Sequence, residues 1–596
     1  MHRIQFGDLK GVTLDKNWGL FPDPMDRARQ QTWWKSVRKV GHFFPSYDED
    51  SFWPTTVPGA FNCVHPNLEY YEGHVVYRLR FQTRLAATGE RAFLHFRGVA
   101  ERASFFLNSS FLGEHDGGCC AFTCDVTQAL KEDNLLYVLV DNRRLPDSVP
   151  GLMHDWWHDG GIHRPVELFY RPSEFVRECA VTTRLDGAEA LITVRVLIDT
   201  PNRDSRRDVS VRLVEPGSGK VVVTGELPCL GGAWSELTVR IPRSSLALWS
   251  PTSPNLHRIE AVLGTDRWSD TTGLREIRTC GRQLLLNDAP LLLRGAAAWT
   301  QDRERGTFSH GTESAALTVA LLKRLNCNFA RAGHRPPSRE LVRACDQAGI
   351  LLWAEVPAYW VAQMQKPAPT RRALQALEET LREHRNSPSI ILWSIGNECA
   401  YGAVDHEHSN MDYFTEAADW LHEHDPSRLV TYTGGIEGIG KENLSHHCPP
   451  ELIEKLDVIG INNYAGINDG ADPSQPEEFP LQYDKIRFLS ASGKPVILAE
   501  AGIDAVRGET GFDFGEARQR DYHHKLQQLF KELTAEGSLQ GMSLFVLSDF
   551  RTPLKFSRFQ RTFNRKGLID DQHIEKAAWA VARDGYAESA RTEPAE

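Results

Sequence analysis

Two patterns of apolar and polar residues divide the chain. Up to about residue 275, short strand-like runs such as His74–Phe81 and Ala190–Ile198 are broken by Gly, Asn and Pro. Short strands without long helical stretches between them are typical of β-sandwiches. We therefore predict a jelly-roll β-sandwich over residues 1–172, and an immunoglobulin-like β-sandwich over residues 173–275.

Beyond residue 275, apolar strand-like runs alternate with amphipathic helical runs. The expected strands are Leu291–Ala296, Cys327–Gly333, Ile350–Val356, Ile390–Gly396, Leu429–Thr433, Asp457–Asn463, Pro495–Glu500 and Met542–Leu547. The expected helices between them include Glu313–Arg324, Arg371–His384, Met411–His424 and Glu516–Leu533. Near-continuous apolar strands are typical of a parallel sheet that is covered on both faces. Eight strand–helix repeats predict a C-terminal (β/α)8 TIM barrel over residues 276–596.

Composition and charge narrow the class of protein. With 41% hydrophobic and 25% charged residues, the chain of 596 residues is neither disordered nor fibrous. Its formal charge of −11 gives no sign of a nucleic-acid partner. No run reaches the ~18 apolar residues that span a bilayer, and the first residues contain no apolar signal core. We therefore expect a cytoplasmic chain that does not contact a membrane, and the odd count of 11 cysteines indicates reduced thiols.

Two glutamates close apolar strands of the predicted barrel. The fourth strand stops at Asn397-Glu398, and the seventh stops at Glu500. An unpaired carboxylate costs several kcal/mol in an apolar core, so such residues belong at the barrel mouth. One glutamate of this kind is most simply explained by a structural ion pair. Two of them, at the end of the barrel where active sites gather, indicate catalysis.

Two carboxyl groups that face one pocket can cleave a glycosidic bond. One protonates the departing oxygen, and the other attacks the anomeric carbon or activates water. A separation of ~5 Å between them gives retention, and ~6.5–9.5 Å gives inversion. The sequence leaves the separation and the two roles open. This chemistry requires no metal and no cofactor, and we expect neither.

Two segments around these glutamates resemble glycoside hydrolase family 2. They are Asn386–Glu398 (NSPSIILWSIGNE) and Lys494–Gly502 (KPVILAEAG). Residues 71–77 and His154–Arg164 (HDWWHDGGIHR) resemble the family's N-terminal sugar-binding domain, so the resemblance spans nearly the whole chain. It implies that Glu398 is the acid/base, that Glu500 is the nucleophile and that Asn397 binds the 2-hydroxyl group of the substrate.

A second motif, Asn564-Arg565-Lys566-Gly567, follows the last barrel strand. It resembles the Asn-x-Lys pair of the family's β-glucuronidases, which implies that Asn564 and Lys566 grip a uronic acid carboxylate. A neutral sugar would leave the lysine unpaired, and that penalty favours uronides. The alternative is a solvated basic loop. Arg558 and Arg561 are both candidates for an arginine that assists the carboxylate, and we include Arg561 among the predicted site residues.

Three further residues match family positions. By resemblance, His334 binds the sugar, Asp155 reaches from the first domain to a sugar hydroxyl, and Tyr464 orients the nucleophile. Each has a plainer alternative: a structural histidine, an aspartate that caps a turn, and a core tyrosine.

The resemblance implies a retaining exo-β-glycosidase that releases terminal β-D-glucuronic acid from a glucuronide or another carbohydrate that contains uronic acid. The eighth strand carries Phe545 where β-glucuronidases have tryptophan, which leaves the C4 epimer open. A β-galacturonidase is therefore the first alternative, and a neutral β-galactosidase or β-mannosidase is the second. A noncatalytic carbohydrate-binding protein is the alternative from another class. The family likeness also suggests a homo-oligomer.

Overall fold

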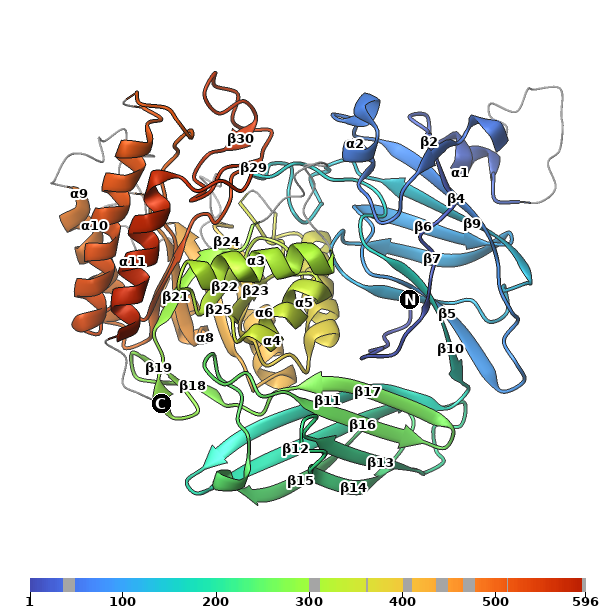
Figure 1. Cartoon of the computed structure of the whole chain (residues 1–596). Helices are drawn as coiled ribbons and strands as arrows, with labels where there is room; N and C mark the ends of the chain where they lie inside the picture. The colour runs from blue at the N-terminus through green and yellow to red at the C-terminus, as the bar shows by residue number, and fades with distance from the viewer. Residues whose placement is uncertain are drawn as a thin grey trace.

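A computed structural model describes residues 1–35, 49–299, 311–360, 363–399, 410–435, 449–464, 478–511 and 513–591. Two β-sandwiches and a barrel make up the molecule (Figure 1). The barrel strands lie between the first sandwich and a layer of C-terminal helices, and the second sandwich lies below the barrel in this view. Within the described ranges, no helix has the length and apolar character needed to cross a membrane.

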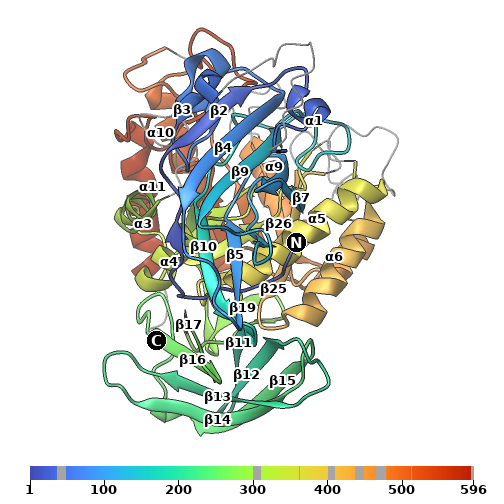
Figure 2. The same cartoon turned by 90° about the vertical axis from the view of Figure 1, so that its right-hand side faces the viewer.

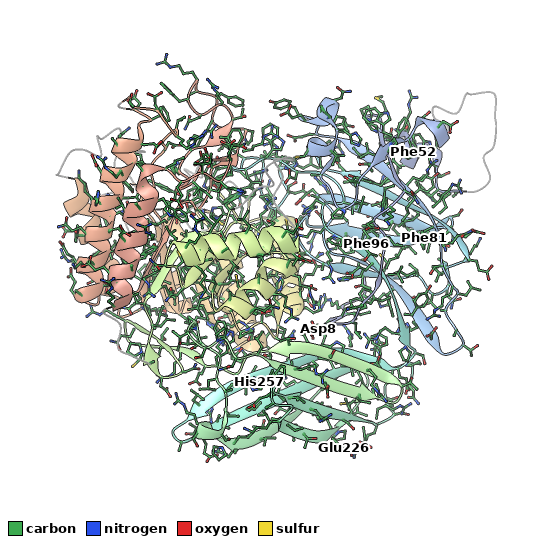
Figure 3. The ribbon with its side chains drawn as sticks, in the orientation of Figure 1. Asp8, Phe52, Phe81, Phe96, Glu226 and His257 are labelled. Atoms are coloured by element: carbon green, nitrogen blue, oxygen red, sulfur yellow. The ribbon has the colours of Figure 1, made fainter. Side chains whose placement is uncertain are left out.

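The first sandwich consists of a four-stranded and a six-stranded sheet. The four-stranded sheet contains, in spatial order, β1 (Val12–Thr13), β10 (Val166–Pro172), β5 (Glu90–Phe96) and β8 (Phe122–Asp125). The six-stranded sheet contains β3 (Trp53–Thr55), β2 (Trp18–Pro22), β4 (His74–Gln82), β9 (Asp133–Asp141), β6 (Arg102–Leu107) and β7 (Ser110–Asp116). Inward-facing residues such as Phe96, labelled in Figure 3, form its core. The sandwich is as predicted, and its jelly-roll topology stays a prediction.

The second sandwich consists of a three-stranded and a four-stranded sheet. The three-stranded sheet contains β11 (Phe175–Asp186), β12 (Glu189–Asp199) and β15 (Trp234–Pro242). The four-stranded sheet contains β14 (Val221–Cys229), β13 (Arg207–Val214), β16 (His257–Leu263) and β17 (Asp266–Thr272). Buried residues alternate with exposed or half-buried ones along β17, as expected for a strand with one face on the core. Figure 2 shows this sandwich below the other two parts.

Eight parallel strands close the barrel, which confirms the predicted TIM barrel. In order, they are β21 (Leu293–Ala297), β22 (Phe329–Ala332), β23 (Leu351–Glu355), β24 (Ile390–Asn397), β25 (Leu429–Gly435), β26 (Val458–Asn462), β27 (Val496–Glu500) and β28 (Gly541–Leu544). All residues of these strands are buried, because helices cover the outside while side chains fill the inside. A small sheet of β18 (Ile277–Cys280), β19 (Gln283–Leu286) and β20 (Ala289–Pro290) precedes them. The boundaries proposed after residues 172 and 275 stay predictions.

Helices of the barrel include the four predicted ones and four others. The predicted ones are α3 (Thr312–Arg324), α5 (Pro367–His384), α6 (Met411–His424) and α10 (Glu516–Ala535). The others are α4 (Arg339–Ala348), α8 (Pro450–Lys455), α9 (Glu478–Ser490) and α11 (Ala577–Arg591). The α-helices of the first sandwich within the described ranges are short: α1 (Arg27–Gln31) and α2 (Phe61–Val64).

Polar contacts fix the sandwiches on the barrel. Asp8, labelled in Figure 3, forms ion pairs with Arg339 and Arg343 of α4 and accepts a hydrogen bond from Thr271 of β17. One residue of the N-terminal segment therefore joins the barrel to the second sandwich. At the other end of the first sandwich, Glu69 pairs with Arg551 of β29 (Phe550–Arg551). The first sandwich is thereby held beside the carboxyl ends of the barrel strands, where sites form in such barrels.

Candidate active site

The carboxyl ends of the barrel strands carry a buried polar network around Arg331 of β22. The Arg331 guanidinium donates to Glu500 Oε1 at 2.5 Å, to Glu355 Oε2 at 2.8 Å and to Asn397 Oδ1 at 2.8 Å. These partners stand at the ends of β27, β23 and β24. Burial of each charge is tolerated because it is paired and hydrogen-bonded. One arginine thus ties together the ends of three other strands.

Glu355, at the end of β23, anchors one side of this network. It accepts hydrogen bonds from His334 Nδ1 at 2.6 Å and from Ser394 Oγ at 2.9 Å, in addition to Arg331. Burial alone would raise the pKa of Glu355, but the charge of Arg331, followed by that of His334, holds this pKa at about 2. Glu355 is therefore ionised at neutral pH. Its partner His334 also approaches Glu500 Oε1 with Nε2, at 3.3 Å.

The carboxylate of Glu500 has donors on both of its oxygens. Arg331 and His334 approach Oε1, while the Tyr464 hydroxyl donates to Oε2. Tyr464 follows β26, which is the neighbour of β27 in the barrel. The main chain keeps the two strand ends in register, since Asn463 N donates to Glu500 O at 2.9 Å. The expected contact between Tyr464 and Glu500 is thus present.

Glu398 follows β24 and lies 8% exposed, so its carboxylate is almost completely shielded from water. Its Oε1 accepts from Asn462 Nδ2 at 2.9 Å, and its Oε2 accepts from Trp360 Nε1 at 2.8 Å. Its backbone is in the left-handed region (φ 49°), which is uncommon for a residue other than glycine. The bond from Glu398 N to Thr433 O, at 2.8 Å, holds this conformation in place. Neighbouring strands therefore fix the direction of the side chain.

Short chains of contacts join the two glutamates. Asn462 Nδ2 donates both to Glu398 Oε1 and to Asn397 Oδ1, at 2.9 and 3.0 Å, and Asn397 Oδ1 also accepts from Arg331. Arg331 in turn binds Glu500. Burial raises the pKa of nearby Tyr359 well above its ordinary value, and the charges of Asp155, Glu398 and Glu500 raise it further. Glu398 and Glu500 therefore belong to one site.

Aromatic side chains pack around the two glutamates. Trp156 of the first sandwich meets Trp299, which follows β21, and Tyr359 at ring-centroid distances of 5.7 and 5.0 Å. Trp299 stacks on Phe550 at 4.3 Å, and Phe545 meets it edge-on at 6.1 Å. Aromatic rings beside polar groups are chemically suited to contact with a sugar ring.

Lys566 lies beside this site and is 7% exposed. Its Nζ is 3.4 Å from Asp504 Oδ2 and lies 5.2 Å from the centre of the Tyr464 ring, whose hydroxyl binds Glu500. Burial and the nearby charge of Lys555 lower the pKa of Lys566, against the opposing charge of Asp504. Tyr464 therefore contacts both the predicted lysine and the predicted nucleophile.

Asp155 of the first sandwich contacts the barrel segment that carries Lys566. It accepts from Thr552 Oγ1 at 2.6 Å and from Asn564 Nδ2 at 2.8 Å. Asn564, which is in β30 (Phe563–Asn564), accepts from Lys566 N at 3.2 Å. Gly567 allows this close path, since a Cβ there would lie 2.2 Å from Asp549 N. Asp155 and Asn564 therefore position the loop.

Arg561 is the predicted site residue that the structure leaves apart from the others. It is exposed, and its Nε donates to Arg558 O at 3.1 Å. The Arg558 side chain is also exposed and packs over the Phe559 ring at 4.6 Å. Neither arginine has a contact with Lys566 or Glu500 among those found in the described part of the chain.

Several site residues were not among the sequence-based predictions. Arg331 and Glu355 are conspicuous polar residues near the ends of apolar strands in the sequence, but the sequence assigned no role to them. Asn462 stands near a strand end in the same way. Lys555 and Asp504 lie in irregular segments, where no periodicity or motif marks them.

Comparisons with known proteins agree with this arrangement. Residues 12–172 match the model of the sugar binding domain of glycosyl hydrolases family 2, and residues 277–532 match the model of the TIM barrel domain of the same family. The β-glucuronidase of Paenibacillus borealis is 25% identical over 98% of this chain and 96% of its own length.

Solved structures share the fold. The β-glucuronidase of Bifidobacterium dentium complexed with coumarin-3-O-glucuronide is similar with a TM-score of 0.83 and 25% identity, over 97% of this chain and 96% of that one. The Ruminococcus gnavus β-glucuronidase in complex with D-glucuronic acid has a TM-score of 0.82 and 22% identity, over 98% of this chain and 100% of that one. From these matches and from its three-part architecture, this chain belongs to glycoside hydrolase family 2 and is a glycosidase.

Proposed function

We propose that the protein is a retaining exo-β-glycosidase that removes terminal β-D-glucuronic acid. The observation that carries this proposal is that Glu398, Glu500 and Lys566 converge on one site. Glu500 connects through Arg331 and Asn397 to the amide that orients Glu398, and through Tyr464 to Lys566. Two carboxyl groups and a cation are the groups that hydrolysis of a β-uronide requires.

In the first step, Glu500 attacks the anomeric carbon while Glu398 protonates the departing glycosidic oxygen. Arg331 and Tyr464 hold the Glu500 carboxylate in place for this attack. The products are a glycosyl ester on Glu500 and a free aglycone. Asn462 and Trp360 fix the direction of Glu398, so that its proton is delivered from a defined position.

In the second step, ionised Glu398 takes a proton from water, which attacks the anomeric carbon and releases the sugar from Glu500. Two inversions at the same carbon give net retention. The assignment of Glu398 as acid/base and Glu500 as nucleophile follows the resemblance of their sequence segments to family 2. By the same resemblance, Asn397, which accepts a hydrogen bond from Arg331, binds the 2-hydroxyl group, and His334, which lies beside Glu500, binds the sugar.

Specificity for a uronide comes from the loop that carries Lys566. The lysine ammonium binds the C6 carboxylate, and Asn564 fixes the lysine backbone and offers its second amide N–H to the same group. The two solved structures named above support this proposal, because their ligands are a glucuronide and glucuronic acid. A galacturonide presents the same carboxylate, so it is the nearest competing substrate.

A panel of nitrophenyl glycosides tests the proposal. The β-D-glucuronide, β-D-galacturonide, β-D-glucoside, β-D-galactoside and β-D-mannoside are assayed side by side. We expect kcat/KM to be highest for the glucuronide, by at least ~100-fold over the neutral sugars, because a neutral sugar offers the buried Lys566 no carboxylate beyond the 3.4 Å contact with Asp504. A preference for the galacturonide would change the proposed substrate to the C4 epimer of the glucuronide. A preference for a neutral sugar would contradict the proposed role of Lys566. Binding of a sugar without turnover would contradict the proposal that the protein is an enzyme.

A further inference from the structure

A second lysine lies beside Lys566 in the same loop. Lys555 is between β29 and β30, and its side chain is 19% exposed. Its Nζ donates to Asp504 Oδ2 at 3.5 Å, and Lys566 Nζ is 3.4 Å from the same oxygen. The two ammonium groups are close enough for each to affect the pKa of the other. Two cations therefore share one carboxylate oxygen.

The other oxygen of Asp504 fixes that carboxylate in place. Oδ1 accepts from Arg565 N at 2.9 Å and from Gln560 Nε2 at 3.3 Å. Burial would raise the pKa of Asp504, but the charges of Lys566 and Lys555 hold this pKa well below its ordinary value. Asp504 is therefore a fixed anion, and Oδ2 is the oxygen that faces the lysines.

One oxygen does not satisfy two ammonium groups. Each ammonium has three N–H donors, and charge-assisted bonds to carboxylates are typically ~2.7–2.9 Å long. Both distances to Asp504 Oδ2 are longer than that. The two lysines and Asp504 together carry one surplus positive charge, and the nearby carboxylate of Asp155 already accepts from Thr552 and Asn564. The two lysines therefore have enough N–H donors and positive charge to bind one more carboxylate.

Its position relates this cluster to the proposed chemistry. Lys566 lies 5.2 Å from the centre of the Tyr464 ring, and Tyr464 binds Glu500. A group at the far end of a sugar whose anomeric carbon meets Glu500 would lie on the side of the lysines. Arg558 and Arg561, by contrast, are exposed on the same loop and bind within it.

We propose that Lys555 is a specificity-determining residue which, with Lys566, forms a two-lysine clamp for the C6 carboxylate of a uronide. This inference rests on the proposed function and extends it, because the Asn-x-Lys motif supplies only Lys566. Lys555 takes the place that the sequence suggested for an arginine of the loop. A carboxylate between the two ammonium groups also offsets their mutual repulsion.

Four variants test the clamp: Lys555→Met, Lys555→Arg, Lys566→Met as reference and Arg561→Met as an exposed control. Each is assayed with nitrophenyl β-D-glucuronide and β-D-glucoside, and binding of D-glucuronic acid is measured by calorimetry. We expect Lys555→Met to lower kcat/KM for the glucuronide ~10- to 100-fold, since a hydrogen bond to a charged group is lost. The glucoside should change less than ~2-fold, Lys555→Arg should retain most activity, and Arg561→Met should match the wild type.

Two results overturn the clamp while leaving the proposed function intact. One is an unchanged glucuronide kcat/KM and D-glucuronic acid affinity in Lys555→Met. The other is an equal loss on both glycosides, which would make Lys555 a structural residue. If the wild type neither cleaves the glucuronide nor binds D-glucuronic acid, the proposed function fails and the clamp fails with it. The wild-type measurement therefore separates the two failures.

Discussion

The barrel strand ends and the segment from β29 to Lys566 build different parts of the site. Arg331, Glu355 and Glu500 stand on strands of a closed barrel, and each is bound to residues of other strands. Lys555 and Lys566, by contrast, stand on a loop that is held by Asp504 and, through Asn564, by Asp155 of the first sandwich. The barrel thus fixes the groups proposed to react, while a loop and a second domain place the groups proposed to select the sugar.

This difference predicts that the two regions respond differently to mutation. A change at a strand end disturbs a buried network that also supports the fold, because breaking a buried ion pair leaves a charge without its partner. A change in the loop alters the discrimination between sugars and leaves the barrel intact. Such a division would let one fold serve different substrates through its loops.

The largest effects are expected at the two glutamates. Glu500→Gln removes the nucleophile, and we expect kcat/KM for nitrophenyl β-D-glucuronide to fall by roughly 10⁴-fold or more. Glu398→Gln removes the proton donor, and we expect a loss of ~10²–10⁴-fold that is larger for an alkyl glucuronide than for the nitrophenyl one. Steady-state kinetics with both aglycones measure this pattern.

The dependence of the activity loss on the aglycone distinguishes the proton donor from the nucleophile. A poor leaving group needs the proton from Glu398, whereas a nitrophenolate departs without it. If Glu500→Gln, and not Glu398→Gln, showed the stronger dependence on the aglycone, the roles would be reversed. Activity retained in both variants would place the chemistry elsewhere.

The next largest effect is expected on the stability of the fold, when Glu355 is replaced. Its folded pKa of about 2 lies below the ordinary value of 4.5, so ionised Glu355 stabilises the fold above about pH 4.5. This contribution is lost as the pH falls from 4.5 towards 2. At pH 7, Glu355→Gln should lower the free energy of unfolding by about 3 kcal/mol, and the difference from wild type should shrink in acid. Thermal unfolding at several pH values measures it.

Asp266→Asn is a matched control, because Asp266 forms a buried ion pair with Arg171 away from the site, at 2.9 Å. It should lower stability and leave the kinetic constants of the folded enzyme unchanged. Glu355→Gln should lower both stability and activity. If kcat and KM were the same in Glu355→Gln as in Asp266→Asn, Glu355 would have no influence on the proposed catalytic groups.

The loop should alter specificity without altering stability. Lys566→Met removes a cation, and we expect kcat/KM for the glucuronide to fall ~100-fold while the glucoside changes less than ~2-fold. Tm should stay near wild type, because Lys555 still pairs with Asp504 in this variant. Lys531→Met is the control, since Lys531 pairs with Glu588 at the surface. A fall in kcat/KM for both sugars, or a large drop in Tm, would contradict the proposed difference between the loop and the strand ends.

The smallest effect is expected at the link between the two domains. Asp155→Asn keeps the shape of the side chain but weakens the bonds to Thr552 and Asn564. We expect KM for the glucuronide to rise ~10-fold, with little change for the glucoside, because the loop that carries Lys566 loses its support. The two KM values measure it. An equal loss on both sugars would instead indicate that Asp155 binds a sugar hydroxyl.

The sequence predicted the barrel well and the loop only in part. Strands such as Ile390–Gly396 are mostly apolar and are followed by polar residues. The positions of these strands, and the placement of Glu398 and Glu500 at the carboxyl ends of their strands, therefore follow from local pattern alone. The hydrogen bonds of Arg331, in contrast, depend on which strands become neighbours when the barrel closes. Lys555 has no such local signal. Its place beside Lys566 depends on the path of the loop, which Asp504 and Asp155 fix from distant parts of the chain.

The most direct test of the central claim is covalent trapping of the proposed intermediate. Reaction with 2-deoxy-2-fluoro-β-D-glucuronosyl fluoride, followed by digestion and mass spectrometry, shows which carboxylate attacks the sugar. The account predicts a single labelled peptide that contains Glu500, and no label in Glu500→Gln. A label on Glu398 or on another residue, or turnover with inversion and no trapped sugar, would contradict it.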